Sequence, residues 1–247
     1  GFYSSAVKNS FIKELMSNDS SSLWSADDET QNKSKLSLFL KQLDKKKLLK
    51  YKKDFNYIWK WSVNKPDIFW SEVWDFTKII GVKGKRILKN NKIIYKSQFF
   101  PDARLNYAEN LLVKRNDETA IKFLSENNTE KKISWKHLYE NVCKFSFFLK
   151  KIKLKEKQTI AAYVPNSIET IICFLAASKN GLVWSSCSPD FGTKAVIDRF
   201  LQIKPKVLIT CDHYYYNGKK INILDKIPNI LKKIKSIKKV IVFPYDK

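Results

Sequence analysis

Two adjacent lysines, Lys219 and Lys220, have a type and spacing that could serve phosphate binding. They follow three consecutive tyrosines and Gly218, which could act as a hinge, and two ammonium groups on such a loop could meet one phosphate. The chain has 43 lysines (47 Lys and Arg, of which four are Arg), so the pair could equally be ordinary surface residues. The pattern alone leaves both interpretations open.

The two lysines belong to the last of three loops that each follow an apolar run typical of a strand. These loops comprise residues 165–167, 185–192 and 212–220. In open α/β sheets, ligands bind at the carboxyl ends of the strands, so a site is expected here. The second loop offers hydroxyls, an acid and a glycine. None of the three contains GxGxxG or GxxxxGK[ST], so a nucleotide site built on either glycine-rich device is absent from this sequence.

Cysteine and histidine give little support for metal or nucleophilic chemistry. The two histidines, His137 and His213, lie far apart, and no two cysteines have CxxC spacing. The cysteines lie in apolar runs, which is typical of small buried side chains in a reducing compartment. They are Cys143, Cys173, Cys187 and Cys211. We therefore predict no metal site and no disulfide in this chain, and two distant histidines leave little from which to build a catalytic triad.

The formal net charge of +23 invites a nucleic-acid or membrane interpretation. Only four basic residues are arginines, however, and arginine is the residue that usually grips phosphates and bases. An A+T-rich coding bias explains abundant Lys, Ile, Asn and Tyr better, so we predict no nucleic-acid partner. No span approaches the roughly 20 apolar residues of a membrane helix, and no signal pattern opens the chain, which predicts no membrane partner and a cytoplasmic location. A non-catalytic basic binding module remains an alternative, and it would bind nucleic acid with a steep salt dependence.

The second half of the chain has the pattern of an α/β domain. Apolar runs typical of strands alternate with helical patterns of 10 to 15 residues, which predicts a mostly parallel layered sheet flanked by helices. Ser134 is placed to cap the first of these helices and Asn166 the second, with Glu169 in capping-box register. The expected strands are residues 119–123, 132–134, 159–164, 182–187, 207–211 and 240–243.

The first half predicts an aromatic-rich helical extension. Helices are expected at residues 4–16, 36–43, 54–62 and 66–77, with an extended arm at 18–35 and a hairpin-like region at 81–95. We place the domain boundary so that residues 1–98 form the helical extension and residues 99–247 the first part of a large α/β domain.

Residues 100–112, FPDARLNYAENLL, lie at this boundary and contain no lysine. Pro101 and Asp102 favour a first helical turn, which predicts a capped helix with one apolar face. We interpret this helix as the connector that docks the aromatic helices onto the sheet. Arg104 and Glu109 would then be buried or bridging partners of the connector and not catalysts.

Several segments together resemble the N-terminal part of the acetoacetyl-CoA synthetase family, within the acyl-adenylate-forming enzymes. The order and spacing of the matching residues hold from about Leu23 to the end of the chain, and the SPDFG and DRF segments favour acetoacetate over acetate as the acid. The segments are Leu23-Trp24, Trp61-Ser62-Val63, Phe69-Trp70, Trp74-Asp75-Phe76, residues 100–112, Tyr163-Val164-Pro165-Asn166, Gly181, Trp184-Ser185-Ser186, Ser188-Pro189-Asp190-Phe191-Gly192 and Asp198-Arg199-Phe200.

The resemblance implies an acid–thiol ligase that uses ATP, Mg²⁺ and coenzyme A to activate acetoacetate and transfer it to the thiol. It assigns the helical extension to the acetyl-CoA synthetase N-terminal type and residues 99–247 to an AMP-binding domain. It also implies that the ATP loop and the catalytic residues lie beyond Lys247. This chain would then be an inactive N-terminal fragment that binds no cofactor tightly, and its oligomeric state is left open.

The resemblance further implies that residues 188–192 and 212–220 approach coenzyme A. Lys219 and Lys220 become candidate contacts to its 3′-phosphate, while Pro189 and Asp190 replace paired glycines that line the pantetheine path. Tyr216 stands where acetyl-type relatives have a basic residue. Two alternatives are an acetyl-CoA synthetase-type ligase and a pseudo-enzyme that binds coenzyme A without turnover.

Overall fold

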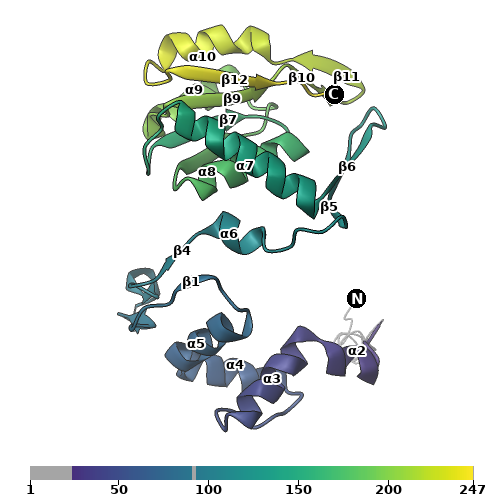
Figure 1. Cartoon of the computed structure of the whole chain (residues 1–247), viewed down its shortest axis with the longest axis vertical. Coiled ribbons are helices and arrows are strands. Elements are labelled where there is room, and N and C mark those ends of the chain that lie inside the picture. Colours follow the sequence, from purple (N-terminus) through teal and green to yellow (C-terminus); the bar gives the residue numbers. More distant parts are fainter. Residues whose placement is uncertain (1–23, 91–92, 247) are drawn as a thin grey trace, which may run out of the picture. The chain divides into compact units, whose positions relative to one another are not determined.

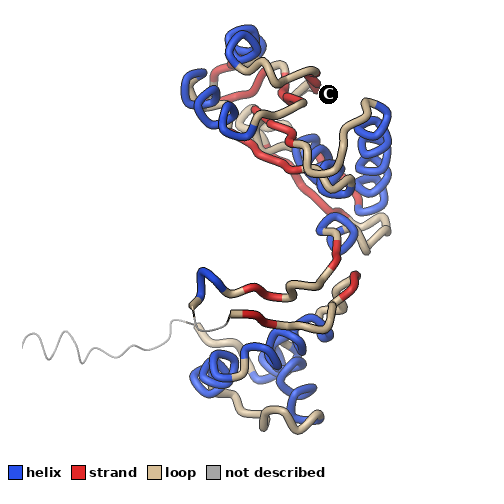
Figure 2. Tube along the Cα trace, turned by 90° about the vertical axis from the view of Figure 1, so that its left-hand side faces the viewer, coloured by secondary structure: helices blue, strands red, loops and turns tan. Residues whose placement is uncertain are grey.

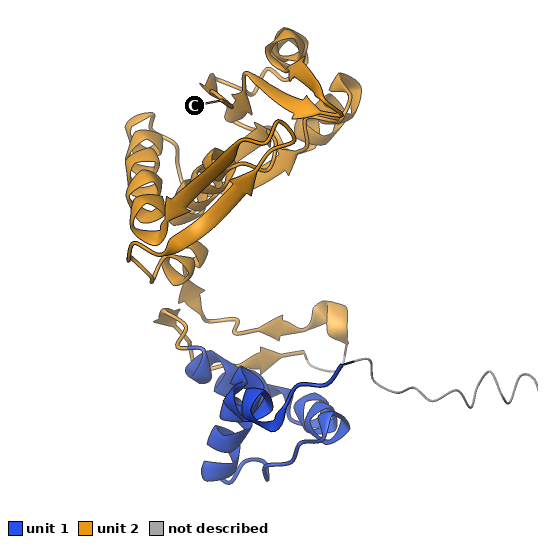
Figure 3. Cartoon of the chain, turned by 90° about the vertical axis from the view of Figure 1, so that its right-hand side faces the viewer, with its two compact units in different colours: residues 1–77 blue, residues 78–247 orange. Residues whose placement is uncertain are grey.

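A computed structural model describes residues 24–90 and 93–246 of the chain (Figure 1). The chain forms two compact units, Gly1–Thr77 and Lys78–Lys247 (Figure 3). The predicted boundary between residues 98 and 99 concerns functional domains, and it stays a prediction. Within the described residues, no helix combines the length and the apolar character that a membrane span needs.

The first unit is helical, as the aromatic-rich pattern predicts. Asp27, Ser34 and Asp54 each accept a hydrogen bond from a backbone N–H of the helix that follows, so polar side chains set three of the four helix starts that the structure describes in this unit. The helices are α2 (Asp28–Lys33), α3 (Lys35–Lys45), α4 (Phe55–Asn64) and α5 (Pro66–Phe76). The extended arm predicted for residues 18–35 is therefore wrong where α2 forms. The helix predicted for residues 4–16 lies outside the described residues.

The core of the first unit gathers apolar side chains from α3 and α4. Leu43 is fully buried, and Phe39 packs edge-on against Phe69 of α5, with ring centroids 6.1 Å apart. Aromatic pairs of this geometry contribute about 0.5–1.5 kcal/mol beyond their buried area. The buried members are Phe39, Leu40, Leu43, Leu49 and Ile58. Phe69 and Phe76 pack partly buried against this core, whereas Phe55 and Trp59 are exposed, so only part of the aromatic residues joins the helical core.

The second unit begins with short antiparallel pairs in place of the predicted hairpin of residues 81–95. Strand β1 (Gly81–Val82) pairs with β4 (Arg104–Leu105), and β2 (Leu88–Lys89) pairs with β3 (Gln98–Phe99). A short 3₁₀ turn, η1 (Ile94–Lys96), precedes β3. Each strand therefore pairs with a segment further along the chain, which local turn signals alone do not predict.

The helix predicted to start near Pro101 is wrong in its first half. Residues 100–103 form a turn that leads into β4, and only α6 (Tyr107–Leu111) is helical. Asn106 is the N-cap, and its side chain accepts a hydrogen bond from the N–H of Glu109. The apolar periodicity holds only for Ala108 and Leu112, which are buried.

The main sheet has four parallel strands in the order β12–β9–β7–β8. They are β7 (Thr159–Tyr163), β8 (Val183–Cys187), β9 (Val207–Cys211) and β12 (Lys239–Phe243). A separate antiparallel pair, β5 (Thr119–Leu124) and β6 (Glu130–Ser134), precedes it. The predicted mostly parallel α/β arrangement is confirmed, and its strands and helices can be followed in Figure 2.

Helices cover both faces of this sheet, as the alternation of buried side chains shows. Ile160, Ala162 and Ile209 pack with α7 (Trp135–Lys151) and α8 (Ile168–Lys179). Their strand neighbours Ala161 and Leu208 pack with α9 (Thr193–Ile203) and α10 (Ile227–Lys233). Because side chains alternate along a strand, the two clusters lie on opposite faces of the sheet. This explains why the strands are near-continuous apolar runs.

The four cysteines are free thiols, and three of them are buried. Burial raises the pKa of Cys173 and of Cys211 to about 12, so these thiols stay protonated at neutral pH. The prediction of small buried side chains is confirmed for Cys173, Cys187 and Cys211, while Cys143 is half-buried.

Candidate functional site

After the carboxyl ends of the neighbouring strands β7 and β9, the chain continues to opposite faces of the sheet. From β7 the chain enters α8 on one face, whereas from β9 it passes through a hairpin and η2 (Leu224–Lys226) to α10 on the other face. The strands are neighbours in the sheet. Ligands of open α/β sheets bind where adjacent strands diverge in this way, so this edge is the candidate site.

The first of the three predicted loops caps a helix, but not with the predicted residue. The side chain of Ser167 accepts a hydrogen bond from the N–H of Thr170, so Ser167 and not Asn166 is the N-cap of α8. Asn166 is exposed at this edge of the sheet. The capping box predicted from Asn166 and Glu169 is therefore wrong, because the helix begins one residue later. Sequence patterns resolve helix ends to no better than about one or two residues.

The second loop, residues 188–192, is held from below by a tyrosine and a lysine. The hydroxyl of Tyr163, the last residue of β7, lies 2.8 Å from the carbonyl oxygen of Pro189 and 2.7 Å from that of Phe191. The ammonium group of Lys226 lies 3.2 Å from the Tyr163 hydroxyl oxygen and 3.3 Å from the Pro189 carbonyl oxygen. Since the hydroxyl carries one hydrogen, it accepts from Lys226 and donates to the two carbonyls in turn.

The Tyr163 hydroxyl is a permanent donor in the physiological range. The side chain is fully buried. Burial raises the pKa of Tyr163 to about 12, and the nearby charge of Asp190 adds to the effect. The hydroxyl therefore keeps its proton, and the hydrogen bonds to residues 188–192 persist over the whole neutral range.

The third predicted loop, residues 212–220, is not a loop. It forms most of a β-hairpin whose strands are β10 (His213–Tyr216) and β11 (Lys219–Asn222). The two connecting residues, Asn217 and Gly218, have φ of 50° and 70°, which is the backbone that Asn-Gly favours in a two-residue hairpin turn. The Asn-Gly dipeptide in the sequence indicates a two-residue hairpin turn, and the adjacent tyrosines are typical strand residues.

This hairpin separates the two candidate lysines. Tyr216 lies opposite Lys219, and Tyr215 lies opposite Lys220. Residues directly opposite each other share a face and neighbours in one strand alternate, so Lys219 and Lys220 point to opposite faces of the hairpin. Both side chains are exposed.

Only the Lys219 face is turned toward the second loop. Tyr214 shares that face; burial raises its pKa, and a hydrogen bond to Asp190 raises it further. Lys220 shares the other face with Tyr215, and its charge helps to lower the pKa of Asp246. Lys219 therefore shares a hairpin face with Tyr214, which bonds Asp190, whereas Lys220 lies on the face that carries the charges around Asp246.

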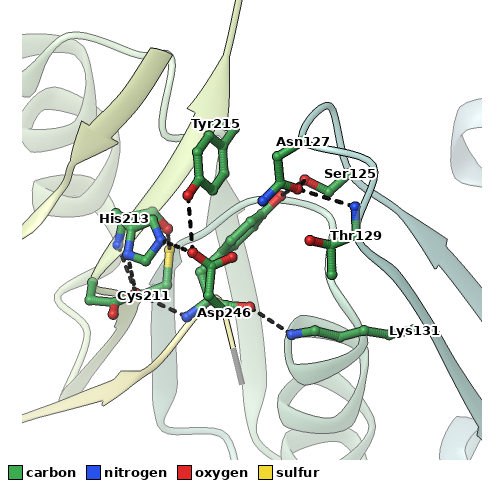
Figure 4. Close-up of polar contacts among 10 residues, drawn as sticks. Ser125, Asn127, Thr129, Lys131, Cys211, His213, Tyr215 and Asp246 are labelled. Atoms are coloured by element: carbon green, nitrogen blue, oxygen red, sulfur yellow. Dashed lines mark hydrogen bonds and ion pairs between the residues drawn. The ribbon is translucent and has the colours of Figure 1, made fainter. Parts of the chain in front are cut away.

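That second group is centred on His213 (Figure 4). Its Nε2 atom lies 2.8 Å from Oδ2 of Asp246, and its Nδ1 atom lies 3.0 Å from Oδ1 of Asp212. The hydroxyl of Tyr215 donates to the same oxygen of Asp246 at 3.1 Å. The hydrogen bond with His213 is the largest influence holding the pKa of Asp246 below its ordinary value. Burial raises the pKa of Asp212, but bonds from the N–H groups of Tyr245 and His213 outweigh it and leave that pKa lowered.

The His213 cluster joins segments that are distant in the sequence. The hydroxyl of Tyr245 bonds to Ser125 at 3.1 Å, and the Lys131 ammonium donates to the carbonyl of Tyr245 at 2.6 Å, so β5 and β6 are tied to the end of β12. In the sequence, His213 is one of two histidines that lie far apart. Its partner Asp246 lies 33 residues away, a pairing that no local spacing reveals.

The residues 100–112 motif also works by joining segments of the second unit. Asp102 receives hydrogen bonds from the guanidinium of Arg86, one of them at 2.9 Å. The Asn106 amide donates to the carbonyl of Ser178 in α8 at 2.8 Å. Asn110 bonds both the N–H and the carbonyl of Ile80. These contacts position backbone and do no chemistry.

Two expectations for this motif have different outcomes. Arg104 and Glu109 are both exposed, so the expectation that they are buried is wrong. The bridging contacts come instead from Asp102, Asn106 and Asn110, which carry short polar side chains suited to bonding backbone groups. That the motif docks the N-terminal helices onto the sheet stays a prediction.

Metal and nucleophile chemistry can be considered for the part of the chain that the structure describes. Residues 24–90 and 93–246 contain no group of three His, Cys, Asp or Glu side chains arranged to hold a metal ion. The cluster around His213 contains no serine or cysteine nucleophile bonded to the imidazole. The candidate site thus comprises the Tyr163-anchored loop and the Lys219 face of the hairpin, and its role in binding stays a prediction.

Comparison with known proteins agrees with this architecture. Residues 109–247, more than half of the chain, match the family described as AMP-binding enzyme. The chain is 38% identical over 192 residues to the acetoacetyl-coenzyme A synthetase of Rhizobium meliloti (strain 1021) and 37% identical over 196 residues to the acetoacetyl-CoA synthetase of Xenopus tropicalis. Each match covers 78% of this chain and 29% of the relative.

A solved structure is similar over most of the described fold. The acetoacetyl-CoA synthetase from Streptomyces lividans matches with a TM-score of 0.83 and 28% sequence identity, covering 90% of this chain and 35% of that chain. The fold is therefore that of an α/β domain with a parallel sheet and a helical N-terminal region. The chain belongs to the AMP-binding enzyme family. It spans about a third of the length of these relatives.

Proposed function

We propose that this chain is the N-terminal part of an acetoacetate–CoA ligase that forms AMP. The observation that carries the proposal is the 38% identity over 192 residues to a protein named acetoacetyl-coenzyme A synthetase. The TM-score of 0.83 to a structure of the same name supports it from the fold. The activity would serve lipid and ketone-body metabolism in the cytoplasm, and the four free cysteines support a reducing compartment.

In this proposal, ATP supplies the adenylyl group that activates the acetoacetate carboxylate, and coenzyme A supplies the thiol that accepts the acyl group. The described residues offer no metal-binding group, and the sequence has no glycine-rich phosphate loop of the two kinds considered above. The described residues thus show no site for Mg²⁺, and the chain spans about a third of the length of its relatives. We assign ATP, Mg²⁺ and the catalytic residues to the part of those relatives that this chain does not cover.

Coenzyme A fits this chain better, because an exposed ammonium and a fixed loop lie on one side of the hairpin. Lys219 would pair with the 3′-phosphate, a contact between a point charge and an anion. Pro189 and Asp190 would line the path of the pantetheine arm. Lys220 faces Asp246 and would contribute less, although it was a candidate on sequence grounds. None of these contacts is expected to bind the cofactor tightly to this chain alone.

The test is the reaction of the protein encoded by the complete open reading frame. Purified protein with acetoacetate, ATP, Mg²⁺ and coenzyme A should release AMP and form acetoacetyl-CoA, with no product when any one substrate is omitted. AMP release that requires acetate and not acetoacetate would replace the proposal with an acetyl-type ligase. Coenzyme A binding without AMP release under every condition would replace it with a pseudo-enzyme.

A further inference from the structure

The space beneath residues 188–192 contains a buried polar arrangement that the proposed function does not use. Tyr163 ends β7 with its side chain fully buried, and its hydroxyl faces the carbonyl oxygens of both Pro189 and Phe191. Most buried tyrosine hydroxyls need one partner. Here two loop carbonyls face one hydroxyl. This contact fixes the orientation of two peptide groups within a five-residue loop.

Lys226 completes the arrangement from the segment between the hairpin and α10. It precedes α10 and is half-buried, and its ammonium contacts the Tyr163 hydroxyl and the Pro189 carbonyl. The ammonium also lies 5.7 Å from the centre of the Tyr163 ring. Its hydrogen-bond partners among the described residues are neutral oxygens, so the dipoles of a hydroxyl and a carbonyl stabilise the positive charge of Lys226 beneath the loop. Hydrogen bonds from a charged donor are stronger than neutral ones.

The anchored carbonyls set the geometry of the part of the loop that faces outward. Pro189 is buried, whereas Asp190 is exposed beside it and its side chain bonds Ser188 at 2.7 Å. Since the carbonyls of residues 189 and 191 point down to Tyr163, the peptide N–H groups that follow them point away from the sheet. The same loop reaches Tyr214 on the Lys219 face of the hairpin through Asp190. Tyr163 and Lys226 therefore connect the sheet to both parts of the candidate binding edge.

We propose that Tyr163 and Lys226 are positioning residues that hold residues 188–192 in the conformation that receives the pantetheine arm of coenzyme A. This inference rests on the proposed ligase function. It predicts that the two side chains act on thioester formation and not on adenylate formation. They touch no reacting atom, and their effect passes through the backbone of Pro189 and Phe191.

The experiment uses the complete protein with Tyr163→Phe and Lys226→Met. The first variant removes the hydroxyl and keeps the ring, and the second removes the ammonium and keeps the apolar stem. Losing one buried hydrogen bond to the loop should raise the KM for coenzyme A about fivefold to tenfold. Acetoacetate-dependent exchange of pyrophosphate into ATP, which needs no coenzyme A, should stay within about twofold of the wild-type rate.

Three controls make the result specific. Lys232→Met removes an exposed lysine from α10, the helix that follows Lys226, and should leave both rates unchanged. Ser146→Ala removes a buried hydroxyl that bonds Asn180 at the opposite edge of the sheet, so it reports loss of a buried bond alone. Lys226→Arg keeps a charged donor and should recover part of the coenzyme A affinity.

Hydrogen exchange of residues 188–192 separates failure of this inference from failure of the proposed function. Without substrates, these amides should exchange faster in Tyr163→Phe and Lys226→Met than in the wild type or in Lys232→Met. Unchanged exchange overturns the inference whatever the activity. A parallel fall of both half-reactions also overturns it, because that result indicates a structural role only. If the wild type makes no acetoacetyl-CoA, the proposed function fails, and the positioning role for coenzyme A fails with it even where exchange shows that the loop is anchored.

Discussion

The opposite orientation of Lys219 and Lys220 leads to a prediction that distinguishes two neighbouring lysines. We expect Lys219→Ala to raise the KM for coenzyme A in the complete protein and Lys220→Ala to leave it nearly unchanged. The reason is geometric, since the cross-strand pairs place Lys219 on the face that carries Tyr214 and Lys220 on the face that carries Tyr215. The two variants remove the same charge from adjacent positions, so each is the matched control for the other.

The expected magnitude follows from simple electrostatics. A unit charge about 4 Å from a phosphate of nearly two charges gains about 2 kcal/mol in water, and salt at physiological strength reduces this to about 1.2 kcal/mol. That corresponds to a KM about five to ten times higher for Lys219→Ala. Lys220 points away across the hairpin, so its ammonium lies roughly 10 Å further from the phosphate, beyond one screening length. Its removal should change the KM by less than about 1.5-fold.

The assay compares coenzyme A with dephospho-coenzyme A, which lacks the 3′-phosphate. The KM for the full cofactor should rise in Lys219→Ala, while the KM for the dephospho form should be equal in Lys219→Ala and the wild type. The proposed contact is refuted if Lys220→Ala has the larger effect. It is also refuted if Lys219→Ala impairs both cofactor forms equally, because the lysine would then act on something other than the phosphate.

Three further predictions concern stability and are measured by urea or acid denaturation of the chain. Ser167→Ala should lower the free energy of unfolding by about 1 kcal/mol through loss of the α8 cap, and Asn166→Ala should cost less than about 0.5 kcal/mol; the reverse order would restore the capping assignment made from sequence. The pKa of Asp246 is lowered by its bond to His213, so the contribution of this carboxylate to stability is present above the ordinary carboxyl pKa and is lost as the pH falls through the lowered value. Asp246→Asn should therefore reduce the loss of stability at acid pH. An unchanged loss would show that the pair does not stabilise the fold. Leu43→Ala should destabilise the first unit by about 3 kcal/mol, because the side chain is fully buried, and a cost below about 1 kcal/mol would contradict the assigned core.

The α/β layer could be predicted because its signals are local and repeated. Each strand from β7 to β12 in the main sheet is an apolar run bounded by turns, and such runs predict a parallel sheet with helices on both faces. The strand order β12–β9–β7–β8 could not be predicted from local signals, because β7 lies between β8 and β9. The chain must therefore return past β7 after β8, and only tertiary contacts decide this. That order creates the divergence between β7 and β9 where the candidate site lies.

The predictions that failed depended on competition between local preferences. Pro101 and Asp102 favour a first helical turn, but Arg104 and Leu105 pair with β1, and Asn106 caps the helix that follows. Residues 212–220 follow an apolar strand, which predicts a loop at the end of that strand. The Asn217-Gly218 turn and three tyrosines of this segment favour a hairpin, and this signal was present in the sequence.

The candidate site was only partly accessible from sequence. Residues 188–192 and Lys219 are indicated by their place after strands and by the resemblance. Tyr163 lies in a resembling segment, but nothing local marks Tyr163 or Lys226 as an anchor of the loop. Tyr163 bonds carbonyls 26 and 28 residues away, and Lys226 is 63 residues from Tyr163. Contacts over such separations depend on how the strands are ordered in the sheet.

The central claim is that this chain belongs to a ligase whose acid is acetoacetate, and a competition reaction tests it most directly. The complete protein is supplied with equal concentrations of acetoacetate and acetate, together with ATP, Mg²⁺ and coenzyme A, and both thioesters are quantified by mass spectrometry. We predict acetoacetyl-CoA in excess of acetyl-CoA by at least about tenfold, the range that pocket contacts to a larger acid provide. An excess of acetyl-CoA would contradict the choice of acid, and the absence of both thioesters would contradict the ligase itself.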